Sequence, residues 1–265
     1  MSISSTVVNR ADIKFHEATE VLRPFVGCFW VVTAEQGATI RAVPDGSSAI
    51  SIQLQGRQSS EWSLRGPLLK PDERRFALPA MLVGIRLRPA VGFLLSGIKA
   101  HTLVGRRIAL NRISAFHDLT SEESPRTPEQ CIDVLQRFLV RRLEHARVHE
   151  VIAAALGEID REHGGLRVED VAVRCGVSPR HLHRLMRMWV GYGPKRYATV
   201  IRFQATLHEM EHAPAQTASA LAVQNGYFDQ AHLTLDVARF SGATPGVLAS
   251  DGVSDFSKTR CDDLP

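Results

Sequence analysis

The sequence has few of the features that mark several large classes of protein. It holds four cysteines in 265 residues, and none of them form a Cys-x-x-Cys pair, which argues against a zinc ribbon or a redox dithiol. No apolar stretch approaches the ~20 residues needed to span a bilayer. The N-terminus lacks the continuous apolar segment of a secretory signal. We therefore expect a cytoplasmic protein that makes no membrane contact.

Arrangements typical of catalysis are also missing. No Ser-His-Asp or Cys-His set, P-loop or Gly-x-Gly-x-x-Gly segment stands out from the background. Two histidine pairs, 208 with 212 and 145 with 149, have the i, i+4 spacing of zinc ligands, but no third ligand is evident. We expect no enzyme activity, no cofactor and no metal, and we interpret these residues as surface histidines.

Negative charge is absent from one long stretch of the chain. Residues 171–208 contain no Asp or Glu, yet they contain seven Lys or Arg and three His. From 203 to 257 the balance reverses, because Arg239 is the only Lys or Arg among six acidic residues. A solvated helix face is the simpler interpretation of a charge run. Surfaces normally mix both signs, however, so a stretch of one sign favours a surface that attracts phosphate.

The apolar pattern divides the chain into regions of different fold class. Residues 1–119 form a β-rich region, with expected strands at 25–32, 39–43, 49–54 and 81–87 separated by Gly and Pro. Residues 120–147 read as a linker and a connecting helix. Apolar residues at helical spacing then continue through residues 148–250, and 251–265 read as an acidic, disordered tail. The expected class is α+β, a β-rich N-terminal sensor-like domain followed by an all-α C-terminal domain.

Residues 168–188 read as a helix-turn-helix unit. Gly176 suits the left-handed turn after a first short helix, and Ser178 with Pro179 is typical of the start of a second helix. On that second helix one face carries basic residues at i, i+3, i+4 and i+7, namely Arg180, His183, Arg184 and Arg187. A recognition helix with such a face is suited to the DNA major groove.

A second unit of the same pattern follows at 216–240. Gly226 provides its turn, and Asp229 caps its second helix. Between the units, a helix from Pro194 to about Glu211 would span ~26 Å. Two recognition helices on such a strut could lie about one DNA turn apart, ~34 Å, on one side of the duplex.

These segments resemble the C-terminal domain of the AraC/XylS family of transcription regulators. The matching stretches are GVSPRHLHRL, GYGPKRYATVIRFQ, NGYFDQAHL and FSGATP, and the resemblance covers roughly residues 150–250. The first domain resembles the N-terminal region of one branch of that family, through PDG at 44–46, GPLLKP at 66–71 and VGIRLRPAVGFLLSG at 83–97. The resemblance implies that the N-terminal domain senses an effector or holds a dimer.

The second unit departs from the family pattern. The family usually has arginine where Leu235 stands, an aromatic residue at Val237 and often a basic residue at Ala238. We therefore predict that the first unit supplies most of the DNA affinity and base reading. The second unit would mainly position contacts to the DNA backbone. The candidate DNA-binding residues are Ser178, Arg180, His181, His183, Arg184, Arg187, Lys195, Arg196, Gln230, Thr234 and Arg239.

In the N-terminal domain, Arg86 and Arg88 alternate along an expected strand and could bind an anionic effector if their face lines a cavity. An exposed or internally paired strand face is the alternative. Another open choice concerns the apolar stripe at 132–143, which would either form a dimer helix or dock on its own domain.

The resulting hypothesis is a sequence-specific, DNA-binding transcription regulator. Its expected partner is double-stranded DNA, with a small-molecule effector, a second copy of the chain and RNA polymerase as further candidates. Two alternatives remain open. One is a ligand-binding or enzymatic N-terminal domain whose DNA-binding half is vestigial, and the other is a nucleoid-type binder without sequence preference.

Overall fold

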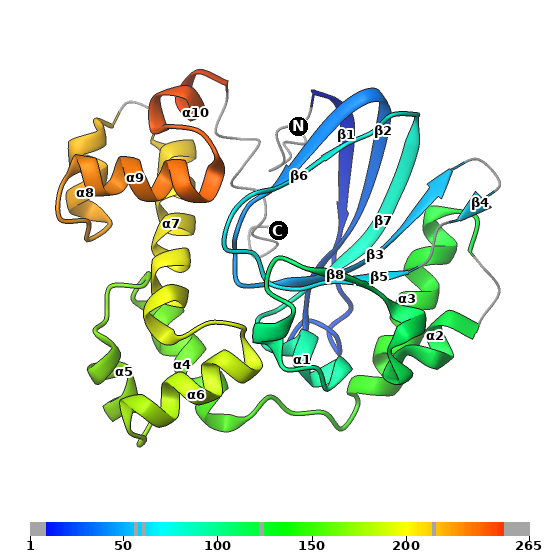
Figure 1. The fold of residues 1–265 in the computed structure, drawn as a ribbon, viewed down its shortest axis with the longest axis horizontal. Helices are drawn as coiled ribbons and strands as arrows, with labels where there is room; N and C mark the ends of the chain where they lie inside the picture. The colour runs from blue at the N-terminus through cyan, green and yellow to red at the C-terminus, as the bar shows by residue number, and fades with distance from the viewer. Residues whose placement is uncertain (1–8, 56–57, 60–61, 122–124, 214–215, 252–265) are drawn as a thin grey trace.

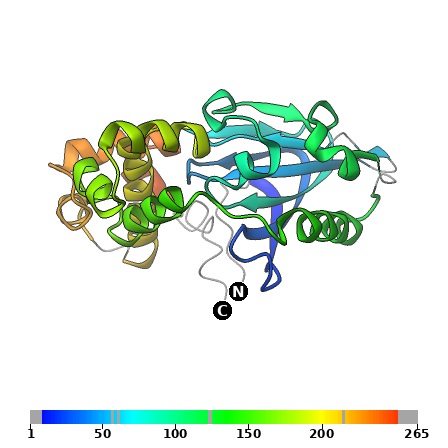
Figure 2. The same ribbon diagram turned by 90° about the horizontal axis from the view of Figure 1, so that it is seen from below.

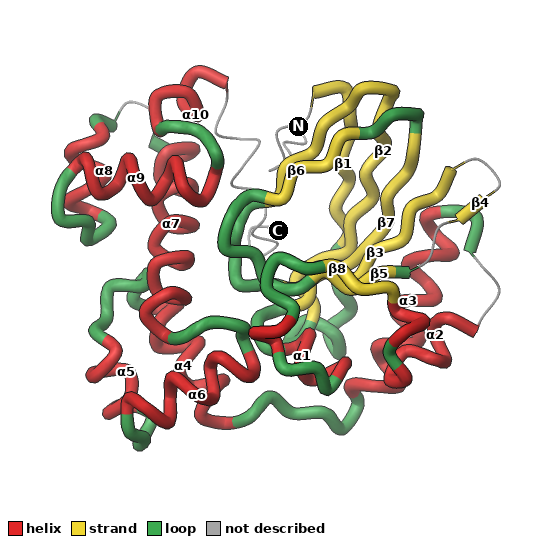
Figure 3. The backbone as a smooth tube through the Cα atoms, viewed as in Figure 1, coloured by secondary structure: helices red, strands yellow, loops and turns green. Residues whose placement is uncertain are grey.

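The computed structural model describes residues 9–55, 58–59, 62–121, 125–213 and 216–251. A strand-rich N-terminal domain lies beside an all-helical C-terminal domain (Figures 1, 2 and 3), which confirms the predicted α+β class. None of the described helices is both long enough and apolar enough to cross a membrane. The predicted tail at 251–265 falls outside the described residues except for Asp251, the last residue of a helix.

The N-terminal domain is built on an antiparallel sheet with the strand order β1-β2-β7-β3-β5-β8, in which β4 pairs with β3 and β6 pairs with β2. Within the described residues, three short 3₁₀ turns and three helices complete the domain. The strands are β1 (Asn9–His16), β2 (Val26–Ala42), β3 (Ser48–Gln55), β4 (Gln58–Ser59), β5 (Ser63–Arg65), β6 (Asp72–Arg75), β7 (Ala80–Leu87) and β8 (Arg107–Ala109). The remaining elements are α1 (Val91–Ser96), η1 (Ala100–Thr102), η2 (Leu110–Arg112), η3 (Ser114–Phe116), α2 (His117–Ser121) and α3 (Pro128–Leu143).

One expectation for this sheet is wrong. The segments 25–32 and 39–43 are not two strands but parts of the single 17-residue strand β2. The first part of β2 pairs with β1 and β7, whereas residues 39–42 pair with β6. Gly37 has a φ of +80°, and its N–H donates to the Phe76 carbonyl. The register of β2 against β1 shifts between Ala34 and Thr39, so the chain bulges around Gly37 while residues 26–42 remain one strand.

Helix α3 docks on its own domain. Its apolar side, which includes Leu135, Phe138 and Leu139, is buried in the same cluster as Phe29 and Ile85 of the sheet. The Phe138 ring also stacks on Phe116 at 5.5 Å between centroids. Of the two alternatives for the 132–143 stripe, the structure therefore shows docking within the domain.

The C-terminal domain consists of two groups of helices joined by α7, the long central helix in Figure 1. Tyr197, Ala198 and Ile201 of α7 are buried with the first group, while Phe203 and Leu207 are buried with the second. The helix predicted to join the two units therefore also forms part of the hydrophobic core of each unit. The helices are α4 (Glu150–Arg161), α5 (Val168–Arg174), α6 (Pro179–Trp189), α7 (Pro194–His212), α8 (Ala218–Gln224), α9 (Gln230–Ser241) and α10 (Pro245–Asp251).

A turn of the N-terminal domain holds α7 in place. The buried Gln204 side chain of α7 donates a 2.6 Å hydrogen bond to the Pro44 carbonyl. Two residues further on, Gly46 has a φ of +82°, and a Cβ there would lie 2.7 Å from Cε2 of Tyr197. Only glycine allows this close approach. The two domains therefore meet through a tight, hydrogen-bonded contact.

We expect Gln204→Ala to lower the free energy of unfolding by about 1–3 kcal/mol, because the buried Pro44 carbonyl would lose its partner. Urea denaturation of the full chain measures this change. The matched control is Gln216→Ala, at an exposed glutamine, which should change the free energy by less than about 0.5 kcal/mol. Equal effects of the two substitutions would show that the hydrogen bond between the domains contributes nothing.

Candidate nucleic-acid interface

Helix α6 is positioned by the local signals that the sequence contains. Gly176 has a φ of +67° and reverses the chain after α5. The Ser178 side chain caps α6 by accepting a 3.2 Å hydrogen bond from the His181 N–H, and Pro179 occupies the first turn. These features fix the angle between α5 and α6, which is what a rigid helix-turn-helix requires.

The two faces of α6 differ sharply. Leu182, Leu185 and Met186 are buried in the core of the first unit. The predicted contact residues on the opposite side are all exposed, and these are Arg180, His181, His183, Arg184 and Arg187. Arg184 contacts its neighbour His181, with 3.4 Å between Nη2 and Nδ1. The structure thus brings these five basic residues together on one accessible surface.

Two grooves border this surface. One, of about 740 Å³, is lined by the five basic residues of α6 together with Lys99 and His101 of the N-terminal domain. The other, of about 470 Å³, runs along the start of α7 to the second unit and is lined by Lys195, Arg196 and Arg239. His183 lines both grooves, so they form one continuous cationic surface. We call this the basic surface.

The basic surface includes the N-terminus of α7. Gly193 is the N-cap residue, Pro194 begins the helix, and the first turn carries no acidic residue. A Cβ at Gly193 would lie 2.5 Å from the His183 ring, so glycine lets the imidazole pack directly against the helix start. The helix dipole favours an anion at such a terminus, and Lys195 and Arg196 add full charges beside it.

Two of the seven cations in the 171–208 stretch lie elsewhere. Arg174 bonds to Glu158 at 2.7 Å, which raises the pKa of the arginine, and it also approaches Glu162. Arg202 donates to the Gly164 carbonyl and lies over the Tyr227 ring. Both side chains are engaged by partners distant in sequence, so they do not line either groove.

The second unit contributes fewer cations to the basic surface. Asp229 caps α9 as predicted, accepting from the His232 N–H at 2.7 Å. Of the candidate residues, Arg239 lines the second groove, whereas Gln230 accepts from the Ser219 hydroxyl and Thr234 donates to a carbonyl of its own helix. The groove also contains the carboxylate of Asp236. Leu235, at 70% exposure, presents an apolar side chain to solvent.

The segment 208–212 reads His-Glu-Met-Glu-His, the spacing of a zinc-peptidase helix. Here Glu209 instead accepts hydrogen bonds from Gln224 and from Asn225, the latter at 2.6 Å. The rings of His208 and His212 lie against each other, with 4.1 Å between centroids. Among the described residues, no three His, Cys, Asp or Glu side chains are grouped in a way that could hold a metal ion.

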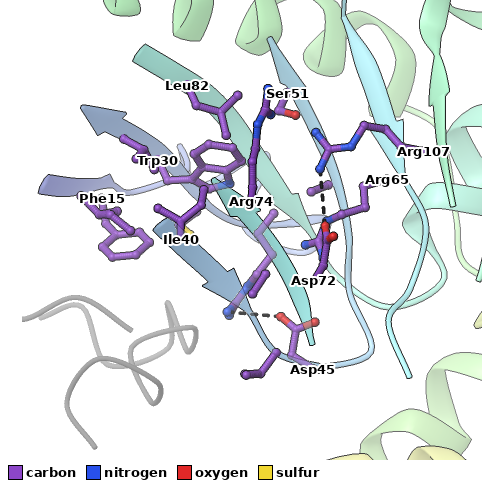
Figure 4. Close-up of a pocket in the computed structure, with 17 residues that line it drawn as sticks. Phe15, Trp30, Ile40, Asp45, Ser51, Arg65, Asp72, Arg74, Leu82 and Arg107 are labelled. Carbon is purple, nitrogen blue, oxygen red and sulfur yellow. Dashed lines mark hydrogen bonds and ion pairs between the residues drawn. The ribbon is translucent and has the colours of Figure 1, made fainter. Parts of the chain in front are cut away.

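The N-terminal domain contains a separate cavity of about 110 Å³ (Figure 4). One part of its lining is apolar and includes Phe15, Trp30, Ile40 and Leu82. The other part is polar and is formed by four arginines and two aspartates, namely Arg65, Arg74, Arg86, Arg107, Asp45 and Asp72. The cavity is therefore amphipathic, with excess positive charge at its polar end.

The arginines of the cavity differ in their partners. Arg86 pairs with Asp45 at 3.5 Å, and Arg107 with Asp72 at 3.4 Å. The Nη1 atom of Arg65 is buried and has no hydrogen-bond partner within the described part of the chain. Burial lowers the pKa of this guanidinium. Arg88 does not line the cavity, because it lies beyond the end of β7 and donates to the Arg23 carbonyl at 2.8 Å.

Sequence reasoning missed several residues at both places. Lys99 is the N-cap residue of the short 3₁₀ turn η1 and His101 lies within it, far from α6 in the chain, and no periodic pattern marks either residue. Arg86 was selected because side chains alternate between the two faces of a strand. The same reasoning applied to β5 and β6 would have selected Arg65 and Arg74. What no local signal shows is that these strands face one cavity.

Two sequence profiles of known protein domains match separate segments of the chain. The sequence profile described as a helix-turn-helix domain matches residues 166–250, and the profile of a domain of unknown function (DUF6597) matches residues 14–109. No curated protein matches the chain.

Three solved structures similar to this chain are distant from it in sequence. A probable AraC family transcriptional regulator from Rhodopseudomonas palustris is 18% identical, with a TM-score of 0.34 over 42% of this chain and 98% of its own. ToxT from Vibrio cholerae is 9% identical, with a TM-score of 0.46 over 92% and 99%. A ToxT structure with bound unsaturated fatty acid is 11% identical, with a TM-score of 0.41 over 94% and 96%.

The profile match falls on the segment that carries α5 to α9 and the basic surface. The resemblance read from the sequence is thereby confirmed for this segment: residues 166–250 match the helix-turn-helix domain profile and form a helix-turn-helix domain of the AraC type.

Proposed function

We propose that the protein recognises a specific DNA sequence by inserting α6 into the major groove. One observation carries this proposal. Arg180, Arg184 and Arg187 are exposed on one face of a capped helix whose opposite face is buried. An arginine placed in this way can make two hydrogen bonds to the O6 and N7 atoms of guanine. The exposed face is therefore suited to reading bases as well as to attracting the backbone.

The remainder of the basic surface is suited to the phosphates that flank the groove. Lys195 and Arg196 stand at the start of α7, where the helix terminus itself favours an anion. Contacts of this kind fix the register of a protein on the duplex without reading sequence. Arg239 of α9 would add a phosphate contact from the second unit.

Base reading by the two units is proposed to be unequal. In the second unit Gln230 and Thr234 already bond to neighbours, Asp236 places a negative charge in the groove, and Leu235 replaces the usual arginine. A carboxylate close to the phosphate backbone opposes binding. The second unit would therefore position the domain, while α6 provides most of the discrimination.

Selection of bound fragments from random DNA tests the proposal directly. A recovered consensus that binds ~10³-fold or more tightly than random duplex of equal length is the expected result. The symmetry of the consensus would report whether one copy or a dimer binds. Recovery without a consensus, and equal affinity for both duplexes, would support the nucleoid-type binder instead.

The unpartnered Nη1 atom of Arg65 favours a second role, the binding of an anionic effector in the N-terminal cavity. A buried donor without a partner costs free energy, and an anion placed there would satisfy it with a charge-assisted hydrogen bond. Trp30 and Phe15 would receive an apolar or aromatic part of the same molecule. Arg86 belongs to this site and Arg88 does not.

Benzoate is a suitable probe because it joins an aromatic ring to a carboxylate. We expect benzoate to raise the melting temperature of the full chain, whereas the uncharged benzamide should not. A tenfold excess over its dissociation constant corresponds to about 1.4 kcal/mol of stabilisation. Arg65→Gln should abolish the shift, and Arg75→Gln, an exposed arginine on β6 outside the cavity lining, should keep it. A shift retained in Arg65→Gln, or produced equally by benzamide, would rule out this site.

A further inference from the structure

The groove beside α6 is not built by the DNA-binding domain alone. Lys99 and His101 of the N-terminal domain line it together with the exposed cations of α6. None of its nine lining residues is acidic. Lys99 is exposed, and no ion pair involves it among the residues that the structure describes. Its charge is therefore free to meet a ligand of the groove.

Packing between the domains fixes this lysine beside α6. The Phe93 ring of α1 meets the Trp189 ring at the end of α6 edge-on, at 4.6 Å between centroids. Gly191, with a φ of +102°, packs against Val104 so tightly that a Cβ would lie 3.0 Å from Cγ2 of that valine. In Figure 1, α1 accordingly lies next to α6. The backbone around Lys99 is held by these contacts, while its ammonium group stays in solvent.

The same arrangement leaves the recognition face open. Arg180, Arg184 and Arg187 remain exposed although α1 and η1 pack at the end of α6. A duplex could therefore reach α6 without separation of the domains. The major groove is ~12 Å wide and is bordered by phosphates on both sides. A cation next to a helix in that groove would meet the backbone rather than a base edge.

We infer that the N-terminal domain is part of the DNA interface, and that Lys99 contacts a phosphate flanking the groove that α6 occupies. His101, two residues further along the chain, also lines this groove. This inference rests on the proposed function. It adds that the two domains bind DNA while they remain packed against each other as in this structure.

Titration of a labelled duplex with the full chain at several salt concentrations tests the inference. Lys99→Gln should weaken binding about 3- to 10-fold for both the selected and a random duplex. It should also reduce the slope of log K against log salt by about 0.9, the value for one lost phosphate contact. Lys99→Arg should restore the wild-type slope. The matched control is Lys14→Gln, which removes an exposed charge from β1 at the far edge of the sheet.

Each outcome decides between this inference and the one on which it rests. Unchanged affinity of Lys99→Gln, alongside a loss in Arg184→Ala, would refute the phosphate contact and leave the proposed function standing. Tighter binding by Lys99→Gln would also overturn the inference, because it would show that the N-terminal domain obstructs DNA. A wild-type protein that binds no duplex would refute both.

Discussion

Arg184→Ala is expected to weaken binding to the selected DNA sequence by about 1–3 kcal/mol, or roughly 5- to 150-fold. Arg184 lies in the middle of the exposed face of α6, four residues after Arg180 and three before Arg187. Within the described part of the chain its side chain bonds to His181 and forms no ion pair, so no strong ion pair must be broken before it meets a base. Loss of a bidentate contact to guanine is the physical reason for the large effect.

Comparison with Gln230→Ala tests the proposed inequality of the two units. Gln230 is exposed on α9, but its side-chain oxygen already accepts from Ser219, and we expect a smaller loss for its substitution. Arg161→Ala, at an exposed arginine of α4 outside both grooves, controls for the removal of one charge. Titrations at a fixed salt concentration measure all three. Equal losses for Arg184→Ala and Gln230→Ala, or a larger loss for Gln230→Ala, would contradict the assignment of base reading to α6.

Binding to DNA should fall by about three orders of magnitude between 50 and 200 mM salt. This value assumes about six phosphate contacts, each releasing condensed counterions from the duplex. The two grooves offer that number of cations without Arg184, namely Lys99, Arg180, Arg187, Lys195, Arg196 and Arg239. Measured dissociation constants over this salt range give the slope, and binding that does not respond to salt would contradict the proposed interface.

Two substitutions in the 171–208 stretch separate the interface from net charge. Lys195→Gln should reduce the slope of log K against log salt by about 0.9, because it removes a cation of the basic surface. Arg174→Gln removes the same formal charge, but Arg174 is already paired with Glu158 and Glu162. It should leave the slope unchanged. Equal changes in both variants would show that total charge, rather than the basic surface, determines affinity.

The C-terminal domain was largely predictable because its signals are local. Gly176, Ser178 and Pro179 act on residues within one helical turn, so the turn and the start of α6 follow from the sequence. The same holds for Asp229 at the start of α9. Helical periodicity also separates the buried Leu182 and Leu185 from the basic face.

The N-terminal domain was less predictable because its pairing is between distant segments. The segments 25–32 and 39–43 read as two separate strands, but both belong to the single strand β2, whose residues 39–42 pair with β6. Docking of α3 depends on the sheet presenting a complementary apolar face, which the helix pattern alone does not specify. Non-local contacts of this kind carry no period along the chain.

The sequence by itself determined the two helix-turn-helix units and the basic face of α6, since capping and periodicity act over a few residues. Only the tertiary structure decided which cations remain available: it pairs Arg174 with α4, turns Arg202 towards Gly164 and brings Lys99 beside α6. It also brought Arg65 and Arg86, from different strands, to one cavity. The physical reason is that charge acts through space, so its partners are set by how distant segments pack rather than by their order in the chain.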